Sequence, residues 1–271
     1  MRNLLMQFIP PIFLSVFRSL VRGNYGLQGD YKRWEEAEAL CQGYADDGLF
    51  ERVKTAALRV KSGEFFSERD SFLFKEPQYS WASLSCLLSV AAREGGRLSV
   101  LDFGGSLGSS YFLNRRFLAG IDAQWSVVEQ AHFVEFGAAH IAEGQLGFFP
   151  DIAICRQGLQ PNVLLLSSVL QYLPAPQHWL DTLCAEGLPY IVIDRTPFNQ
   201  LGRDVLKVQR VDPRIYTASY PAWTLDEGSF LAQVDRHGYR VIETFDSPLD
   251  THGEDFIFKG FFLEKVSHAI S

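Results

Sequence analysis

The chain has 271 residues, 47% of them hydrophobic and 14% aromatic, so it is long enough to bury a substantial core. Its net charge of −7 argues against the basic surface that a nucleic-acid backbone requires, and we predict no nucleic-acid partner. The four cysteines are Cys41, Cys86, Cys155 and Cys184. They are far apart and form no C-x-x-C pair, a spacing that predicts free thiols in a reducing compartment. The six histidines are equally scattered, so the sequence predicts no metal site.

Residues 1–23 are predicted to form an amphipathic N-terminal segment. Leu, Ile, Phe and Val dominate from Asn3 to Val21, but Pro10-Pro11 interrupts the run, which is too broken for a signal peptide or a membrane span. Two interpretations stay open. The segment packs on the protein's own core, or it lies in a membrane interface with its arginines toward the headgroups. We therefore expect a cytoplasmic protein, with peripheral contact to the inner face of the membrane as the alternative.

Residues 24–96 are predicted to form a helical cap. Asn24 to Gly29 is typical of a glycine-punctuated linker, and apolar residues at helical spacing follow in three stretches, 34–44, 49–60 and 79–92. Between them, Ser67-Glu-Arg-Asp70 fits a helix start or a loop.

Residues 97–271 alternate between strand and helix patterns, which indicates a parallel sheet. The expected strands are 98–103, 125–129, 146–149, 163–166 and 190–194, with a helix over 176–185. Thr224-Leu-Asp-Glu227 predicts a capping box for a helix that ends at Gly238. Two further strands, 239–245 and 256–264, have no helix between them and must pair antiparallel. The fold class is thus α/β, a doubly wound, mostly parallel, seven-stranded sheet with an antiparallel last strand.

The first strand ends in an acid and a glycine turn, with a helical pattern directly behind it. Asp102, Gly104, Gly105, Ser106 and Gly108 form this turn, where missing Cβ atoms allow a ligand to approach the backbone. The dinucleotide spacing G-x-G-x-x-G fails, because its second and third positions are serines. The acid-x-Gly-x-x-x-Gly pattern resembles the first motif of class I S-adenosylmethionine (SAM) methyltransferases, with Ser106 in place of the central glycine. A purely structural turn is the alternative.

Further cofactor-binding candidates follow the next two strands. Glu129, 27 positions after Asp102, is placed to accept hydrogen bonds from ribose hydroxyls, with Gln130 beside it. Asp151 follows the third strand, where it faces the adenine amino group or serves as an ordinary loop acid.

Polar and aromatic residues after the fourth and fifth strands are the acceptor-side candidates. Ser167 and Ser168 are expected beside the cofactor, Gln171 beside the substrate, and Tyr172 among the catalytic residues. Asp194 and Arg195 form a charged pair at the end of a buried strand, which indicates a functional pair or a structural ion pair. Residues 214–221 are rich in aromatic and hydroxyl groups and are expected to form a substrate lid that includes Tyr216 and Tyr220.

A hydrolase is a competing hypothesis. Gly104-Gly-Ser-Leu-Gly108 fits the G-x-S-x-G nucleophile elbow, and Asp194 and His252 follow in the order that an esterase using Ser106 requires.

Several blocks together resemble a family of bacterial methyltransferases that tend to be encoded in gene clusters for surface polysaccharide or O-antigen synthesis. The matching blocks are Leu101–Ser109, Val127–Gln130, Ser167–Leu173, Ile193–Pro197 and Ile215–Pro221. The resemblance implies SAM as cofactor and a glycan or small-molecule acceptor. We expect O-methylation of a sugar hydroxyl, with Asp194 as general base, Arg195 orienting it or binding an acidic glycan, and Tyr172 and Tyr216 flanking the acceptor. A non-catalytic binding module with the same fold is the other hypothesis.

Overall fold

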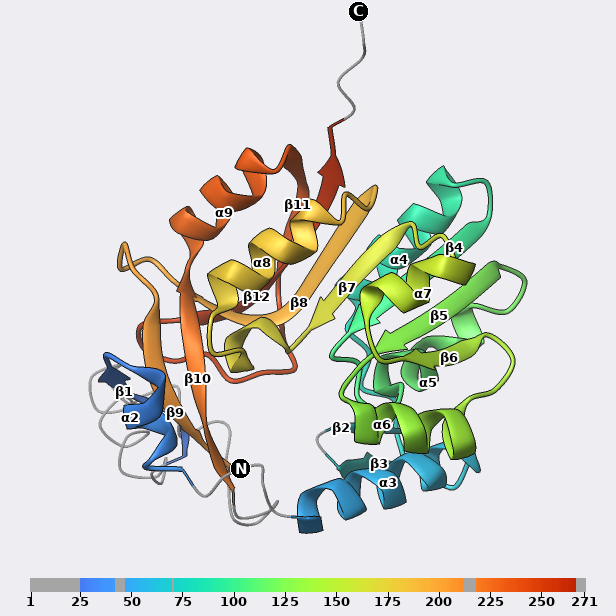
Figure 1. Ribbon diagram of the computed structural model, residues 1–271, viewed down its shortest axis with the longest axis horizontal. Helices are drawn as coiled ribbons and strands as arrows, with labels where there is room; N and C mark the ends of the chain where they lie inside the picture. The colour runs from blue at the N-terminus through green and yellow to red at the C-terminus, as the bar shows by residue number, and fades with distance from the viewer. Residues whose placement is uncertain (1–24, 42–46, 70, 212–217, 267–271) are drawn as a thin grey trace, which may run out of the picture.

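The computed structural model describes residues 25–41, 47–69, 71–211 and 218–266. Ten strands of these residues form one mixed sheet, and two short strands form a separate hairpin (Figure 1). Seven strands have the order β6-β5-β4-β7-β8-β12-β11. Their bounds are β4 Arg97–Phe103, β5 Asp122–Val128, β6 Leu146–Phe149, β7 Val163–Ser167, β8 Tyr190–Asn199, β11 Tyr239–Asp246 and β12 Ile257–Lys265.

The predicted doubly wound arrangement is confirmed for these seven strands. β4, β5, β6, β7 and β8 are parallel to one another. β12 runs antiparallel to both β8 and β11, as the lack of a crossover helix before it predicts. The carboxyl ends of the parallel strands therefore meet at one edge, where an open α/β sheet places its ligand site.

The prediction of only seven strands is wrong, because three more strands extend the sheet. They are β1 (Gly26–Tyr31), β9 (Val205–Arg210) and β10 (Ser219–Asp226), and each pairs antiparallel with its neighbour in the order β1-β9-β10. The expected linker 24–29 thus contributes to β1. The expected lid 214–221 falls partly in β10, while residues 212–217, including Tyr216, lie outside the described residues.

β8 is the element that joins the two parts of the sheet. It was expected to end at Asp194, but it continues to Asn199. Up to Asp194 its parallel neighbour is β7, and beyond that point β10 takes this place, with Leu225 opposite Phe198. β1, β9 and β10 therefore stand beside the carboxyl end of the parallel sheet (Figure 1).

Alternate side chains of the parallel strands build a core on each face of the sheet. In β8, Val192 packs with helices α4 (Trp81–Arg93) and α5 (Ser109–Asn114). Its neighbours Ile191 and Ile193 point to the other face and pack with α7, α8 and α9. The remaining helical bounds are α6 Ala131–Phe136, α7 Ile152–Gly158, α8 Pro176–Ala185 and α9 Glu227–Arg236, with short helical turns η2 Arg115–Phe117, η3 Gly137–Ile141 and η4 Leu170–Tyr172.

The region expected to be a helical cap contains strands as well as helices. α2 is shorter than predicted, at Trp34–Glu38, whereas α3 spans Asp47–Lys61. The stretch from Ser67 is no helix start but β2 (Ser67–Arg69), which pairs with β3 (Phe72–Phe74). The division of the chain into 1–23, 24–96 and 97–271 remains a prediction, and the first segment lies outside the described residues. In the described part of the chain, no helix has the length and apolarity needed to cross a membrane.

The capping box predicted at Thr224 is also corrected. Thr224 is part of β10, and its hydroxyl and carbonyl oxygens accept hydrogen bonds from the Asn199 amide. The N-cap of α9 is Asp226, whose Oδ1 accepts the Ser229 N–H at 2.9 Å. Its other oxygen accepts the Gly202 N–H at 2.9 Å, so one carboxylate fixes both a helix start and a loop.

Replacing Asp226 by Ala should lower the free energy of unfolding by about 0.5–2 kcal/mol, because an N-cap acceptor is lost. The hydrogen bonds from Ser229 hold the pKa of Asp226 below its ordinary value. The stabilisation should therefore be present at neutral pH and lost as the pH falls through this lowered pKa. Urea unfolding at pH 7 and at pH 3 measures both effects. If Asp226→Ala lowered the free energy of unfolding by the same amount at both pH values, the expected loss of stabilisation at low pH would be contradicted.

Candidate functional site

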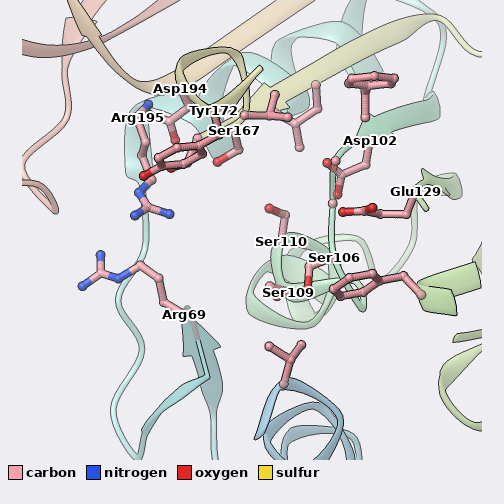
Figure 2. A pocket seen from close by; sticks show the side chains of 18 of the residues that line it. Arg69, Asp102, Ser106, Ser109, Ser110, Glu129, Ser167, Tyr172, Asp194 and Arg195 are labelled. Carbon is pink, nitrogen blue, oxygen red and sulfur yellow. Dashed lines mark hydrogen bonds between the residues drawn. The ribbon is translucent and has the colours of Figure 1, made fainter. Parts of the chain in front are cut away.

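A cavity of about 800 Å³ opens at the carboxyl ends of β4, β5, β7 and β8, within the range of roughly 300–1,000 Å³ typical of small-molecule sites. Figure 2 shows side chains from these strand ends around one space, with residues of the β2–β3 hairpin on its border. The predicted site residues that line it are Asp102, Gly104, Gly105, Ser106, Glu129, Gln130, Ser167, Ser168, Tyr172, Asp194, Arg195 and Tyr220.

The glycine turn requires small residues for two separate reasons. Gly104 has φ +71°, and a Cβ there would lie 2.5 Å from Val169 Cγ2. A Cβ on Gly105 would lie 2.5 Å from the Asp102 carboxylate, which packs beneath the turn. Gly104 also donates its N–H to the Val128 carbonyl at 2.9 Å, which ties the turn to β5. The turn is thus held in a shape that exposes backbone to the cavity.

Asp102 is a buried carboxyl group in the wall of the cavity, with only 1% of its surface exposed. The Trp125 indole donates its N–H to Oδ2 at 2.9 Å. Burial raises the pKa of Asp102 to about 7, opposed by the Trp125 hydrogen bond and reinforced by the nearby charge of Glu129. Asp102 therefore changes its charge near neutral pH.

Glu129 stands directly after β5 and faces the same space as Asp102 (Figure 2). Its Oε2 accepts the Gln130 N–H at 2.7 Å, and the Ser106 backbone also donates to the carboxylate. Burial raises the pKa of Glu129, while these two hydrogen bonds lower it. The carboxylate is thus fixed to the glycine turn in a position to accept hydrogen bonds from a ligand.

Asp194 is the second buried carboxyl group of the cavity, with 2% of its surface exposed. It accepts a hydrogen bond from the Ser80 side chain and one from the Arg195 N–H, at 2.9 Å to Oδ1. Burial raises the pKa of Asp194, and the charge of Arg195 partly offsets this. A carboxylate with a raised pKa at a cavity wall can accept a proton from a bound ligand.

Asp194 and Arg195 do not form the side-chain ion pair that the sequence suggested. The Arg195 guanidinium instead binds Asp250, with Nε at 3.0 Å from Oδ2 and Nη2 at 3.0 Å from Oδ1. Arg195 has φ +53°, a left-handed backbone conformation at this point of β8. Only its backbone N–H orients Asp194.

Gln171, predicted to bind substrate, lies behind the cavity wall and is 1% exposed. Its Nε2 donates to Ser168 Oγ at 3.0 Å and to the Arg195 carbonyl at 3.1 Å. Both partners have positive φ, 60° for Ser168 and 53° for Arg195. Gln171 thus fixes two strained residues that face the cavity.

Tyr172 and Tyr220 meet at the side of the cavity that the three additional strands build. Their ring centroids are 5.3 Å apart in an edge-to-face arrangement. The Tyr172 hydroxyl donates to Gln209 Oε1 on β9 at 2.9 Å. Trp34 of α2 stacks on Trp223 of β10 at 6.5 Å and also borders the cavity. This side is therefore an aromatic wall.

Two cofactor-binding candidates serve local structure and do not line the cavity. Gly108 is the N-cap of α5 with φ +85°. Asp151 is the N-cap of α7, and its Oδ1 accepts the Ile154 N–H at 2.7 Å, although its neighbour Pro150 does border the cavity.

The esterase arrangement is not assembled. Ser106 and Asp194 border the cavity but His252 does not, and His252 Nδ1 accepts the Phe258 N–H at 3.0 Å. With that nitrogen occupied by backbone, His252 is no base for Ser106. Within the described ranges, no cluster of His, Cys, Asp or Glu has a metal-binding arrangement, and the four cysteines are unpaired thiols.

Sequence reasoning missed the contribution of the β2–β3 hairpin and of Ser80. Glu68, Arg69 and Ser71 border the cavity. Glu68 is 8% exposed; its carboxylate accepts the Ser71 N–H at 3.0 Å and the Ser109 hydroxyl proton. No local signal marks these residues, because the hairpin reaches the site by packing on α3 and α5.

No family model and no curated protein matches this chain. Among solved structures, the N-terminal domain of EvdMO1, crystallised with SAH and D-fucose, is 14% identical, with 79% of this chain and 97% of that chain covered and a TM-score of 0.46. CalS10, a SAM-bound amino pentose methyltransferase from Micromonospora echinaspora, is 12% identical. The match covers 69% of this chain and 92% of CalS10, with a TM-score of 0.46. The [4+2]-cyclase SpnF is 12% identical. The match covers 80% of this chain and 95% of SpnF, with a TM-score of 0.44. Likeness at this level identifies no family.

The raised pKa of Asp102 leads to a prediction about stability. A carboxyl group whose folded-state pKa is raised costs stability as the pH rises from its unfolded pKa to its folded one. Between pH 5 and pH 8, Asp102→Asn should therefore gain stability relative to the parent protein, by about 1–4 kcal/mol. Urea unfolding of both proteins across this range measures the difference. Parallel stability curves would mean that Asp102 does not titrate in this range.

Proposed function

We propose that the protein is a SAM-dependent methyltransferase that O-methylates a sugar hydroxyl of a bacterial surface glycan. One observation carries the proposal: the glycine turn, the strand-end Glu129 and the buried Asp194 border a single cavity at the carboxyl edge of the sheet. The candidate cofactor site and the candidate proton acceptor are thus adjacent. The order β6-β5-β4-β7-β8-β12-β11, with antiparallel β12, supports it, because class I methyltransferases end in such an antiparallel strand.

The residues present fit SAM. The turn at Gly104 and Gly105 has no room for a Cβ and leaves backbone exposed to the cavity. Glu129 is fixed by two backbone N–H groups and would accept hydrogen bonds from the ribose hydroxyls. Asp102 would lie toward the amino-acid end of SAM. The other lining residues that would border the cofactor are Ser106, Gln130, Ser167 and Ser168.

SAM, when bound, supplies a methyl group on a positively charged sulfur. The residues of the chain must then orient the acceptor and remove its proton. A sugar hydroxyl is a weak acid, so a base close to it accelerates the reaction. Asp194 is our candidate base, because its carboxylate faces the cavity and hydrogen bonds from Ser80 and the Arg195 N–H fix its orientation.

The aromatic wall is our candidate for the acceptor side. Tyr172 and Tyr220 would lie against the apolar face of a sugar ring, since such side chains combine a large apolar surface with a polar end. The glycan acceptor, the cytoplasmic location and peripheral membrane contact through residues 1–23 belong to the proposal as well. They rest on the resemblance of the sequence blocks to methyltransferases of polysaccharide gene clusters.

Calorimetry should detect binding of SAM and no binding of NAD. Glu129→Gln removes the charged acceptor, and a hydrogen bond to a charged group contributes about 1.5–3 kcal/mol, so SAM affinity should fall about 10–100-fold. Gly104→Val should abolish binding, because its side chain would meet Val169 and obstruct the turn. Glu135→Gln, on the exposed face of α6, is the matched control and should bind like the parent. NAD binding as tight as that of SAM would refute the cofactor assignment.

Asp194→Asn should lower methyl transfer by roughly 10²-fold or more, because the amide cannot accept the proton. SAM affinity should change little, since the base acts in the transition state. Because burial raises the pKa of Asp194, transfer by the parent should rise with pH at values above those of an ordinary carboxylate. The assay follows labelled methyl groups from SAM into a glycan extract.

Asp235→Asn, on the exposed side of α9, is the control for the loss of a carboxylate. Thermal melts show whether each variant folds. Transfer by Asp194→Asn at the parent rate would place the base elsewhere. A parent protein that binds SAM and transfers nothing to any glycan would favour the non-catalytic binding module.

A further inference from the structure

The beginning of α4 presents two serine residues to the cavity. Ser80 is the N-cap residue of α4, and Ser83 lies three positions further on, which places both on one face of the helix. The Ser80 side chain does not cap the helix, and its hydroxyl binds the Asp194 carboxylate instead. The wall around the candidate base is therefore built by α4 as well as by β8.

Ser83 is almost buried in this wall, with 7% of its surface exposed. Among the described residues, no group forms a hydrogen bond with its side chain, although the hydroxyl oxygen is accessible from the cavity. Ser85, on the exposed side of the same helix, donates its hydroxyl proton to the Trp81 carbonyl at 2.7 Å. A nearly buried hydroxyl without a partner costs free energy. A bound molecule in the cavity would supply the hydrogen bond that Ser83 lacks.

Asp194 lies over the stretch of α4 that contains Ser83. Its carboxylate binds Ser80 at the helix start. Burial raises the pKa of the Cys86 thiol, and the charge of Asp194 raises it further, so Asp194 also acts on the helix three positions beyond Ser83. Positions 80, 83 and 86 follow one another along one side of a helix. Ser83 therefore stands between two residues on which Asp194 acts, beside the candidate base.

We propose that Ser83 binds a second hydroxyl group of the acceptor, on the carbon next to the hydroxyl that is methylated. The inference rests on the proposed methyl transfer and adds the class of acceptor: a sugar with two neighbouring free hydroxyl groups. A serine hydroxyl both donates and accepts hydrogen bonds, which matches another hydroxyl. An anionic group would be repelled at this position by the Asp194 carboxylate.

The chemistry of the transfer favours the neighbouring hydroxyl over the reacting one. The reacting oxygen gives its proton to Asp194 and an electron pair to the methyl group, so a further donor on that oxygen would compete with the methyl group. A hydrogen bond from Ser83 to the neighbouring hydroxyl instead fixes the ring and orients the reacting oxygen. This interaction is already made in the bound substrate, so its loss should appear in KM more than in kcat.

The test compares methyl transfer from labelled SAM to the glycan extract by the parent and by Ser83→Ala. KM for the extract should rise roughly 3–10-fold in the variant, because one hydrogen bond between neutral groups is lost. Values of kcat and of SAM affinity should stay close to those of the parent. Linkage analysis of the product with a deuterated methyl label should find a free hydroxyl on a carbon next to the new methoxy group.

Ser85→Ala is the matched control, because it removes a hydroxyl from the same helix outside the cavity wall and should leave KM unchanged. If Ser83→Ala does not fold in thermal melts, Ser83→Cys carries the test: a thiol is nearly the same size but hydrogen-bonds weakly. An unchanged KM, a loss confined to kcat, or a product without a free neighbouring hydroxyl would overturn the inference and leave the proposed function intact. A parent protein that transfers no methyl group would refute both.

Discussion

The hydrogen bond from the Trp125 indole to the Asp102 carboxylate links the two strands on which the candidate cofactor site is built. Asp102 lies near the end of β4, beneath the glycine turn, and Trp125 belongs to β5, which leads to Glu129. The carboxylate occupies the space that a Cβ of Gly105 would need, so the turn must pass close above it. An isolated buried carboxylate is costly, and this hydrogen bond offsets part of that cost.

A second constraint acts at the end of β8. Asp194 is the last residue of β8 that pairs with β7, and Arg195, with φ +53°, bends the strand away. Its continuation pairs with β10, which brings β9, β1 and α2 beside the cavity. This change of pairing partner gives the cavity its aromatic wall.

Backbone strain is concentrated around this cavity. Among the described residues, four that are not glycine have positive φ, and all four border it: Ser71, Ser106, Ser168 and Arg195. Each costs of order 1–3 kcal/mol and persists only where surrounding contacts hold it. Glu68 binds the Ser71 N–H, and Gln171 binds Ser168 and the Arg195 carbonyl. Such conformations are typical of sites whose geometry is selected for a ligand.

The sequence by itself determined the parallel sheet, its antiparallel last strand and the strand ends that carry Asp102, Glu129 and Asp194. These follow from hydrophobic periodicity and from glycine positions, which are local properties. Only the tertiary structure decided the rest. The three extra strands, the partner of Arg195 and the approach of Arg69 and Glu68 depend on contacts between residues far apart in the chain, as between Arg195 and Asp250. Thr224 and Asp226 make the same point on a small scale: both are N-cap residue types, and the pairing of β10 with β8 and β9 decides which one caps α9.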